Sequence, residues 1–145
     1  MVKVLIKKLD PSVELPKYKT TGASGMDLMA FVRQPIKLAP NSSCLVPTGV
    51  SIAFSEDYEV QIRPRSGLAA KNNITVLNTP GTIDSDYRGE IKIILFNHGK
   101  EEFIINNKDR VAQMILSPVI KMELEEIDDL PNTLRGKDGF GSTGK

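Results

Sequence analysis

One segment near the middle of the 145-residue chain combines carboxylates with an aromatic ring and a tight turn, and it runs from Asn78 to Glu90. Pro80-Gly81 predicts the turn. Asp84 and Asp86 are two apart, so they share one face if the chain is extended, and Tyr87 follows them directly. Asp84 is therefore a candidate general base with an aromatic wall beside it. The alternative is a solvated hairpin loop with local Asx turns.

A second segment could hold an anion where a strand ends and a short helix begins, at Arg63–Ala69. Ser66 could cap that helix, with its hydroxyl accepting from the first free backbone N–H groups. The same N–H groups, together with Arg65, could instead bind a phosphate. The residues leave both interpretations open.

Two polar side chains interrupt apolar runs, Asp27 within Ser24–Leu28 and Gln113 within Asp109–Leu116. A buried carboxylate or amide needs a hydrogen-bond partner. Asp27 is therefore an ion-pair partner, a cap, or a neighbour of a cation through water. Gln113 either has a partner for its amide or faces outward from a strand.

The C-terminal stretch differs in composition from the rest of the chain. Residues 131–145 hold four glycines and only two apolar side chains, Leu134 and Phe140. Such a stretch cannot offset its ordering entropy with a core of its own. We expect a flexible tail that is either disordered, which its composition alone favours, or ordered by something that binds it.

The tail also has the chemistry of an anion site. Its last part, Gly139–Lys145, fits the first seven positions of the eight-residue phosphate-binding pattern G-x-x-x-x-G-K-S/T. However, no strand precedes it and no helix follows. Its glycines still let backbone N–H groups converge on an anion. Arg135, Ser142 and Thr143 add side-chain donors.

Composition excludes several classes of site. The chain has one cysteine, Cys44, and one histidine, His98, too few for a disulfide framework or a structural zinc site. Lys and Arg total 19 against 18 Asp and Glu, so we expect no electrostatic binding of nucleic acid or of a membrane surface. No apolar run approaches the roughly 20 residues of a membrane span. We expect a cytoplasmic protein.

Short apolar runs separated by Gly, Pro, Asn or Asp dominate the chain and predict β-strands. No window gives a helical stripe, and only Ser66–Lys71 fits about two helical turns. The pattern predicts an all-β fold, an antiparallel sandwich, jelly roll or barrel, over residues 1–130, followed by the arm 131–145. The predicted strands are Val2–Ile6, Met26–Phe31, Cys44–Val46, Val50–Phe54, Val60–Ile62, Ile74–Leu77, Ile91–Phe96, Phe103–Ile105, Val111–Leu116 and Val119–Leu124.

Taken together and in this order, the polar segments resemble the five motifs of the homotrimeric dUTPase family, the deoxyuridine 5′-triphosphate nucleotidohydrolases. The resemblance spans residues 16 to 144, and its departures, such as Ser24 and Thr82, remove no side chain that the chemistry needs. The matching segments are Ala23–Leu28, Pro64–Ala69, Asn78–Glu90, Asp109–Ile115 and Arg135–Gly144.

The resemblance implies a jelly-roll subunit in a three-fold trimer, with three active sites that each draw on all three chains. It implies hydrolysis of dUTP to dUMP and pyrophosphate with Mg²⁺, which keeps uracil out of DNA and supplies dUMP for dTTP synthesis. Asp84 would orient and deprotonate the water that attacks the α-phosphorus. Tyr87 would pack under the deoxyribose. The uracil edge would be read by Asn78 and by the backbone of Gly81, Thr82 and Ile83.

The same resemblance assigns the phosphates and the metal. Ser66, Gly67 and Gln113 would hold the α- and β-phosphates, with Arg65 supporting that wall. Asp27 would act through water on Mg²⁺ and the phosphates. The tail would close the site, with the γ-phosphate and uracil contacts made by Arg135, Phe140, Gly141, Ser142 and Thr143.

Two alternatives stay open. A dCTP deaminase has a related fold, but related enzymes use a Glu near the base, whereas this hairpin carries Asp84. A catalytically inactive trimer that senses nucleotide is the second, and the intact Asp84 and tail argue against it.

Overall fold

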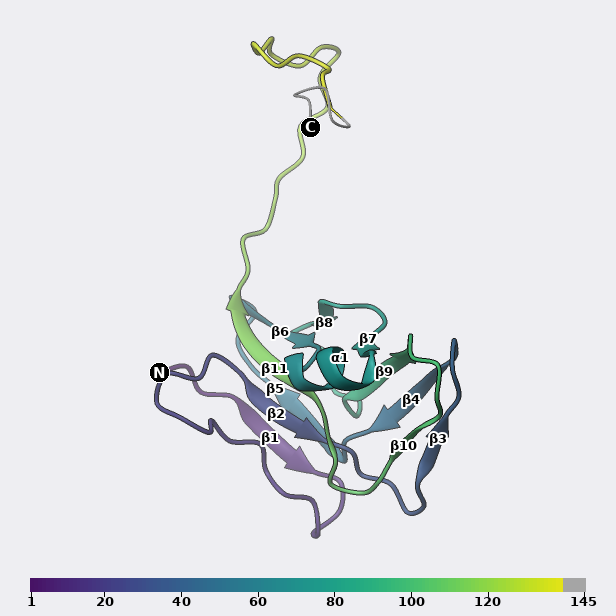
Figure 1. The fold of residues 1–145 in the computed structure, drawn as a ribbon. Helices are drawn as coiled ribbons and strands as arrows, with labels where there is room; N and C mark the ends of the chain where they lie inside the picture. Colours follow the sequence, from purple (N-terminus) through teal and green to yellow (C-terminus); the bar gives the residue numbers. More distant parts are fainter. Residues whose placement is uncertain (140–145) are drawn as a thin grey trace.

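A computed structural model describes residues 1–139. These residues form eleven short strands and one short helix, drawn in Figure 1. The strands are β1 (Leu5–Lys8), β2 (Met26–Met29), β3 (Ile36–Leu38), β4 (Ser43–Pro47), β5 (Val50–Ala53), β6 (Tyr58–Arg63), β7 (Ile74–Val76), β8 (Gly81–Ile83), β9 (Lys92–Asn97), β10 (Phe103–Ile105) and β11 (Arg110–Pro118), and the helix is α1 (Ser66–Asn72).

Every strand pairing is antiparallel. The four-stranded sheet β2-β11-β6-β8 is the largest, and a three-stranded sheet has the order β4-β9-β7. The pairs β1-β5 and β10-β3 complete the body. The predicted all-β antiparallel class is therefore confirmed for the part of the chain that the structure describes.

The core lies between these sheets and is built almost entirely from aliphatic side chains. β9 shows the period of two expected of a pleated strand. Ile93 and Leu95 are fully buried, whereas Lys92 is exposed and Ile94 and Phe96 are half-buried. The other most deeply buried aliphatic side chains are Leu28, Leu38, Val46, Val50, Ile74, Val76, Ile91, Ile105 and Val111.

Residues 119–139 leave this body as an extended arm, which rises away from the sheets in Figure 1. The strand predicted over Val119–Leu124 is wrong for this chain, because the segment has no neighbouring strand edge to pair with. Two polar contacts join the arm's described residues to the body. The Val119 N–H donates to the Asp57 carbonyl at 2.8 Å, and Lys121 Nζ lies 3.5 Å from a Glu56 carboxylate oxygen.

Most of the remaining strand predictions are confirmed within one or two residues, and so is the short helix. The first strand is displaced: Leu5–Lys8 pairs with β5, rather than the predicted Val2–Ile6. Two three-residue strands were not predicted: β3 (Ile36–Leu38), which lies between two prolines, and β8 (Gly81–Ile83), which lies in the segment predicted as a turn and loop. Within residues 1–139, no helix is long and apolar enough to cross a membrane.

Candidate active site

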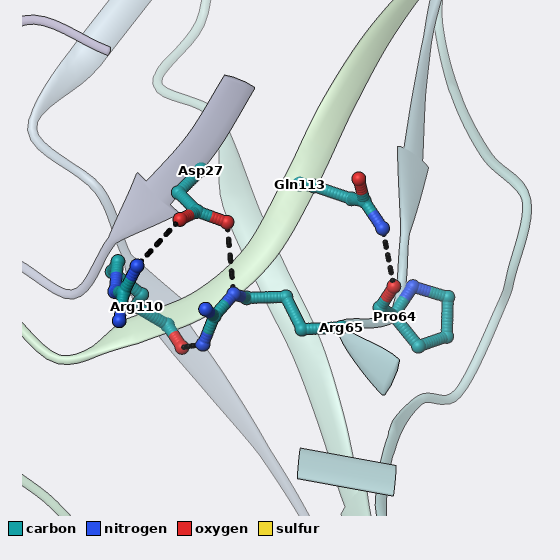
Figure 2. A network of polar contacts seen from close by, with 5 residues as sticks. All are labelled: Asp27, Pro64, Arg65, Arg110 and Gln113. Atoms are coloured by element: carbon teal, nitrogen blue, oxygen red, sulfur yellow. Dashed lines mark hydrogen bonds and ion pairs between the residues drawn. The ribbon is translucent and has the colours of Figure 1, made fainter. Parts of the chain in front are cut away.

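The first half of the candidate site is an ion-pair network at one end of the largest sheet, shown in Figure 2. Asp27 on β2 receives two guanidinium groups, one on each carboxylate oxygen. Arg65 Nε donates to Oδ1 at 2.8 Å, and Arg110 Nη1 donates to Oδ2 at 3.1 Å. Arg65 Nη1 also donates to the Arg110 backbone carbonyl at 3.0 Å. Of the interpretations left open for Asp27, the structure shows the ion-pair partner.

Gln113 braces the same region from β11. Its Nε2 donates to the Pro64 carbonyl at 2.9 Å, so the amide has a partner within the chain, as one of its two predicted interpretations required. Gly25 makes room for it: a Cβ there would lie only 2.8 Å from the Gln113 Oε1. Gln113 and Asp27 therefore hold the connection from β6 to α1 at two successive residues, Pro64 and Arg65.

Ser66 and Gly67 follow this braced connection and are exposed. The predicted N-cap role of Ser66 is wrong. Arg65 is the N-cap, with extended backbone angles (φ −94°, ψ 128°), and no side chain caps the helix. Ser66 is already the first helical residue, so its hydroxyl is not used as a cap. No described atom would lie within 4 Å of a Cβ at Gly67, so the backbone there faces open space.

The second half of the candidate site is the hairpin around β8. Asn78 lies over Gly81, where a Cβ would come within 3.1 Å of the Asn78 Nδ2 and 3.4 Å of the Ile62 Cβ. A larger residue at position 81 would therefore be tightly packed against both and would require the Asn78 side chain to shift by a few tenths of an ångström. The chain turns directly after β8, with the Tyr87 N–H donating to the Asp84 carbonyl at 3.1 Å. The extended arrangement predicted for Asp84 and Asp86 is therefore wrong, because Asp86 lies inside the turn.

Tyr87 is held in one orientation by contacts within the hairpin, although 45% of the residue's surface is exposed. Its hydroxyl donates to the Glu90 carbonyl at 3.0 Å, and the ring covers Gly89, where any Cβ would overlap it. The Glu90 carboxylate in turn accepts from the Gly49 N–H at 2.9 Å, which ties the hairpin to the β4–β5 turn. The ring borders an open groove whose other lining residues are Leu45, Thr82, Ile83, Asp84, Glu90, Lys92 and Ile94.

The two halves lie apart on one sheet. Arg63 pairs with Gln113 at the network's end, whereas Val60 pairs with Ile83 just before Asp84. Asp84 comes directly after Ile83 and so lies four residue rows from the Arg63–Gln113 row. At roughly 3.3 Å per residue, this is a separation of about 13 Å along the strands. Asp27 lies in the same row, opposite Gln113, and its partners Arg65 and Arg110 lie beyond it, on the side away from Asp84. The structure therefore gathers each half of the predicted site but does not bring the halves together.

The remaining predicted site residues belong to the arm. Arg135 is exposed and its Nε donates to the Asp138 carbonyl at 2.8 Å, so it contacts neither half. Phe140, Gly141, Ser142 and Thr143 lie outside the described residues.

The described part of the chain offers few protein ligands for a metal ion. Residues 1–139 contain no cluster of three or more His, Cys, Asp or Glu side chains suited to a metal ion. Asp27 is the carboxylate bonded to Arg65, and its side chain is 19% exposed, so water reaches it although both oxygens already accept guanidinium bonds. This donor set fits a cation that arrives with its own oxygen ligands and is contacted through water.

Sequence reasoning missed Arg110, Gly25, Gly89 and Glu90. Arg110 stands inside the fourth matching segment, but its charge alone did not reveal that its partner is Asp27, far away in the sequence. The two glycines are needed only because of side chains that the fold places over them.

Comparison with known proteins gives one consistent family. The dUTPase family model matches residues 11–144. The deoxyuridine 5′-triphosphate nucleotidohydrolase of Fusobacterium nucleatum is 49% identical over 146 residues, and the match covers 100% of both chains. The protein of the same name from Chlamydia pneumoniae is 54% identical over 138 residues, covering 94% of this chain and 95% of its own length.

Solved structures agree on the fold. A mutant dUTPase of Staphylococcus bacteriophage 80alpha with dUpNHpp has a TM-score of 0.84 and 21% identity, covering 99% of both chains. A mutant dUTPase of phage phi11, in which a structural Mg(II) ion is coordinated, has a TM-score of 0.79 and 18% identity, covering 90% of this chain and 99% of its own. These likenesses confirm the predicted jelly-roll fold. With a family model matching nearly the whole chain and relatives about half identical along it, this chain belongs to the dUTPase family.

Proposed function

We propose that this chain hydrolyses dUTP to dUMP and pyrophosphate, with Mg²⁺, and so keeps uracil out of DNA and supplies dUMP for dTTP synthesis. The observation that carries the proposal is the family match over residues 11–144, within which every side chain that the chemistry needs is present. A nucleotide-pool enzyme of this kind acts in the cytoplasm.

Asp84 is the proposed general base. It is exposed at the end of β8, beside the open groove and next to the turn that fixes Tyr87. An exposed carboxylate can accept a proton from water once the substrate and a closing segment exclude solvent. The attacking water would then reach the α-phosphorus, with pyrophosphate as the leaving group.

The hairpin is the proposed nucleoside subsite. Asn78 and the backbone of Gly81–Ile83 would bind the uracil edge, and the Tyr87 ring would lie under the deoxyribose. The fixed ring supports this role: an orientation set by Gly89 and by a hydrogen bond to the Glu90 carbonyl allows contact with the sugar without rearrangement.

The other half is the proposed phosphate wall, which we define as Arg65, Ser66, Gly67 and Gln113. Ser66 and Gly67 are exposed and face open space, so their donors are free for the α- and β-phosphates. Gln113 uses one N–H on Pro64 and keeps a second N–H for a phosphate oxygen. The γ-phosphate and the outer uracil face would be covered by Arg135, Phe140, Gly141, Ser142 and Thr143.

Mg²⁺ fits this site as a partner of the substrate. A triphosphate supplies oxygen ligands, Mg²⁺ keeps several waters, and Asp27 would contact it through one of them. When bound, the ion neutralises charge on the phosphates and on the leaving pyrophosphate. No carboxylate cage is required of the chain, in agreement with the residues that surround Asp27.

The active form is proposed to be a homotrimer with shared sites. The separation of about 13 Å along the sheet between the Arg63–Gln113 row and Asp84 supports this, because the phosphate wall must approach an Asp84 that it does not meet within its own chain. The division into a β domain (1–130) and a closing arm (131–145) belongs to the same proposal, although the last strand already ends at Pro118.

The arm supplies a second argument for association. Ile120, Met122 and Leu124 alternate along it with 93%, 85% and 87% of their surface exposed. Apolar side chains in such a row favour burial against another surface. A groove on the body is lined by similar apolar residues, Val4, Ile6, Met26, Met114 and Leu116 among them. A trimer would bring such a surface of a neighbouring chain within reach of the arm.

The experiment is a product assay on the purified protein with Mg²⁺. We expect pyrophosphate and dUMP from dUTP, little reaction with UTP, and no ammonia from dCTP. Ammonia release from dCTP would establish the deaminase instead. Tight dUTP binding without any product would establish the nucleotide-sensing alternative.

A further inference from the structure

The ion-pair network around Asp27 contains a residue to which the proposed function gives no task. Arg110 starts β11, and its side chain is 49% exposed. Its guanidinium points at Asp27 from the side opposite Arg65, as Figure 2 shows. Its backbone carbonyl separately accepts from Arg65 Nη1 at 3.0 Å, a contact that does not depend on the Arg110 side chain.

A carboxylate held at one oxygen is not fixed. The terminal torsion of an Asp side chain has a broad, roughly two-fold distribution, so a single hydrogen bond leaves the group free to rotate about it. Asp27 is held at both oxygens, by Arg65 at 2.8 Å and by Arg110 at 3.1 Å. The second contact stops that rotation, and therefore fixes the direction in which Asp27 presents its other oxygen to Arg65.

Arg65 needs this fixing because of its place in the chain. It is the N-cap of α1, its carbonyl accepts from the Ala69 N–H at 3.1 Å, and no side chain caps the helix. Its guanidinium is held only through Asp27 and the Arg110 carbonyl among the described contacts. Ser66 and Gly67, the two exposed members of the phosphate wall, follow directly.

We propose that Arg110 is a positioning residue: acting through Asp27, it fixes Arg65 and thereby the direction in which Ser66 and Gly67 face the phosphates. The inference rests on the proposed function for its effect on catalysis, but not for the contacts themselves. Arg110 itself touches no substrate in this account. Its loss misplaces the α-phosphate relative to the attacking water, while the hairpin and the arm still bind the nucleotide.

The kinetic test uses Arg110→Gln, with Lys108→Gln as its matched control. Lys108 also makes one ion pair, at 2.6 Å to Glu14, but that pair contacts neither Asp27 nor Arg65. We expect kcat for dUTP to fall about 10²-fold in Arg110→Gln, since a misplacement near 1 Å costs that much, with KM changed less than about threefold. Lys108→Gln should keep the wild-type kcat. A fall in the control as large as in Arg110→Gln, or an unchanged kcat in Arg110→Gln, overturns the inference.

Arg110→Lys keeps the charge and loses the planar fork, so it should recover part of the lost kcat. If Arg110→Gln does not fold, Arg110→Lys carries the test alone, with kcat reduced about tenfold at an unchanged KM. A wild-type kcat in the lysine variant then means that charge alone is needed, and the inference fails.

A double-mutant cycle separates positioning from direct contact. In an Asp27→Asn background, Arg110→Gln should lower kcat little further, because its route to Arg65 is already broken. If the two losses multiply, Arg110 acts on the substrate independently of Asp27 and the inference fails.

A measurement made without substrate separates the proposed role of Arg110 from the proposed hydrolysis of dUTP. The ¹⁵N order parameter of the Arg65 Nε–H group should fall in Arg110→Gln and match the wild type in Lys108→Gln. If wild-type protein turns over no dUTP, the proposed function fails, and this measurement alone decides the inference. An Arg65 that is equally ordered in both variants contradicts it.

Discussion

The β-sheet body and the C-terminal arm place site residues in opposite ways. In the body, each half of the site is held by bonds that exist before any ligand arrives. The hairpin's base alone has three: Thr48 Oγ1 donates to the Ile91 carbonyl at 2.6 Å, the Ile91 N–H to the Val50 carbonyl at 2.9 Å, and the Gly49 N–H to Glu90. Catalytic groups on such a frame are preorganised.

The arm has no comparable frame. From residue 119 to 139 it is joined to the body only near its start, through Val119 and Lys121. Its further hydrogen bonds are internal, such as the Asp138 N–H to the Arg135 carbonyl at 3.1 Å. If Arg135 binds the γ-phosphate as proposed, another chain or the nucleotide would have to position it. Under the proposed function, the rigid body would carry the chemistry and the arm would complete it.

The largest expected effect comes from Asp84 in the body. Asp84→Asn should lower kcat by about 10³–10⁴-fold, toward the upper part of the range for a general base, because the amide cannot accept the water's proton. The affinity for a non-hydrolysable dUTP analogue should stay close to that of the wild type. Single-turnover kinetics and calorimetry measure the two quantities, and near-normal turnover would remove Asp84 from the chemistry.

A second, smaller loss should follow from removing the arm's end. A chain that stops after Leu134 lacks Arg135 and the glycine-rich residues, so we expect kcat/KM to fall about 10²–10³-fold, as when donors to a developing charge are lost. The melting temperature should change little, because the deleted residues 135–145 carry a single large apolar side chain, Phe140, so little hydrophobic burial can be lost. A large drop in melting temperature would make the arm's end structural and weaken the contrast with the body.

Tyr87 should give the smallest of the three effects, on selectivity. Its ring is fixed over Gly89, so a ribose 2′-hydroxyl pressed against it would clash and stay unpaired. Tyr87→Ala should reduce the preference for dUTP over UTP by about tenfold, a larger change than in dUTP affinity. Tyr87→Phe is the control, since it keeps the ring and loses only the bond to the Glu90 carbonyl. Equal losses on both nucleotides would argue against this role.

Much of the body was predictable from sequence because its strands carry their own signals. Alternation and β-branched side chains located β5, β6 and β9, and polar residues in otherwise apolar runs pointed to Asp27 and Gln113. Pairing partners are not encoded locally. Leu5–Lys8 is a strand because β5 lies beside it and pairs with it. Its sequence does not show the apolar run typical of a strand, because two of its four residues are lysines.

The same reasoning explains the failures. Val119–Leu124 has the alternation of a strand but no edge to pair with in its own chain, so pattern alone gave a strand that this chain does not form. Asp27 could be recognised as needing a partner, yet nothing local identified Arg65 at the N-cap of α1 or Arg110 at the start of β11, which the fold brings to it from distant parts of the sequence. Likewise, the sequence motifs identified the residues of both halves of the site, but they did not predict that the two halves lie apart on one sheet.

The central claim is that a body and an arm from different chains make one site, and complementation between two inactive variants tests it most directly. Full-length Asp84→Asn keeps an intact arm, and the chain ending after Leu134 keeps Asp84. The two are co-refolded in equal amounts, mixed trimers are confirmed by native mass, and pyrophosphate release is compared with each variant alone. Random assembly in a closed three-fold ring pairs an intact Asp84 with a neighbour's intact arm in roughly a quarter of sites, so we predict roughly a quarter of wild-type activity. Mixed trimers with no more activity than the separate variants would place hairpin and arm in one chain and contradict the account.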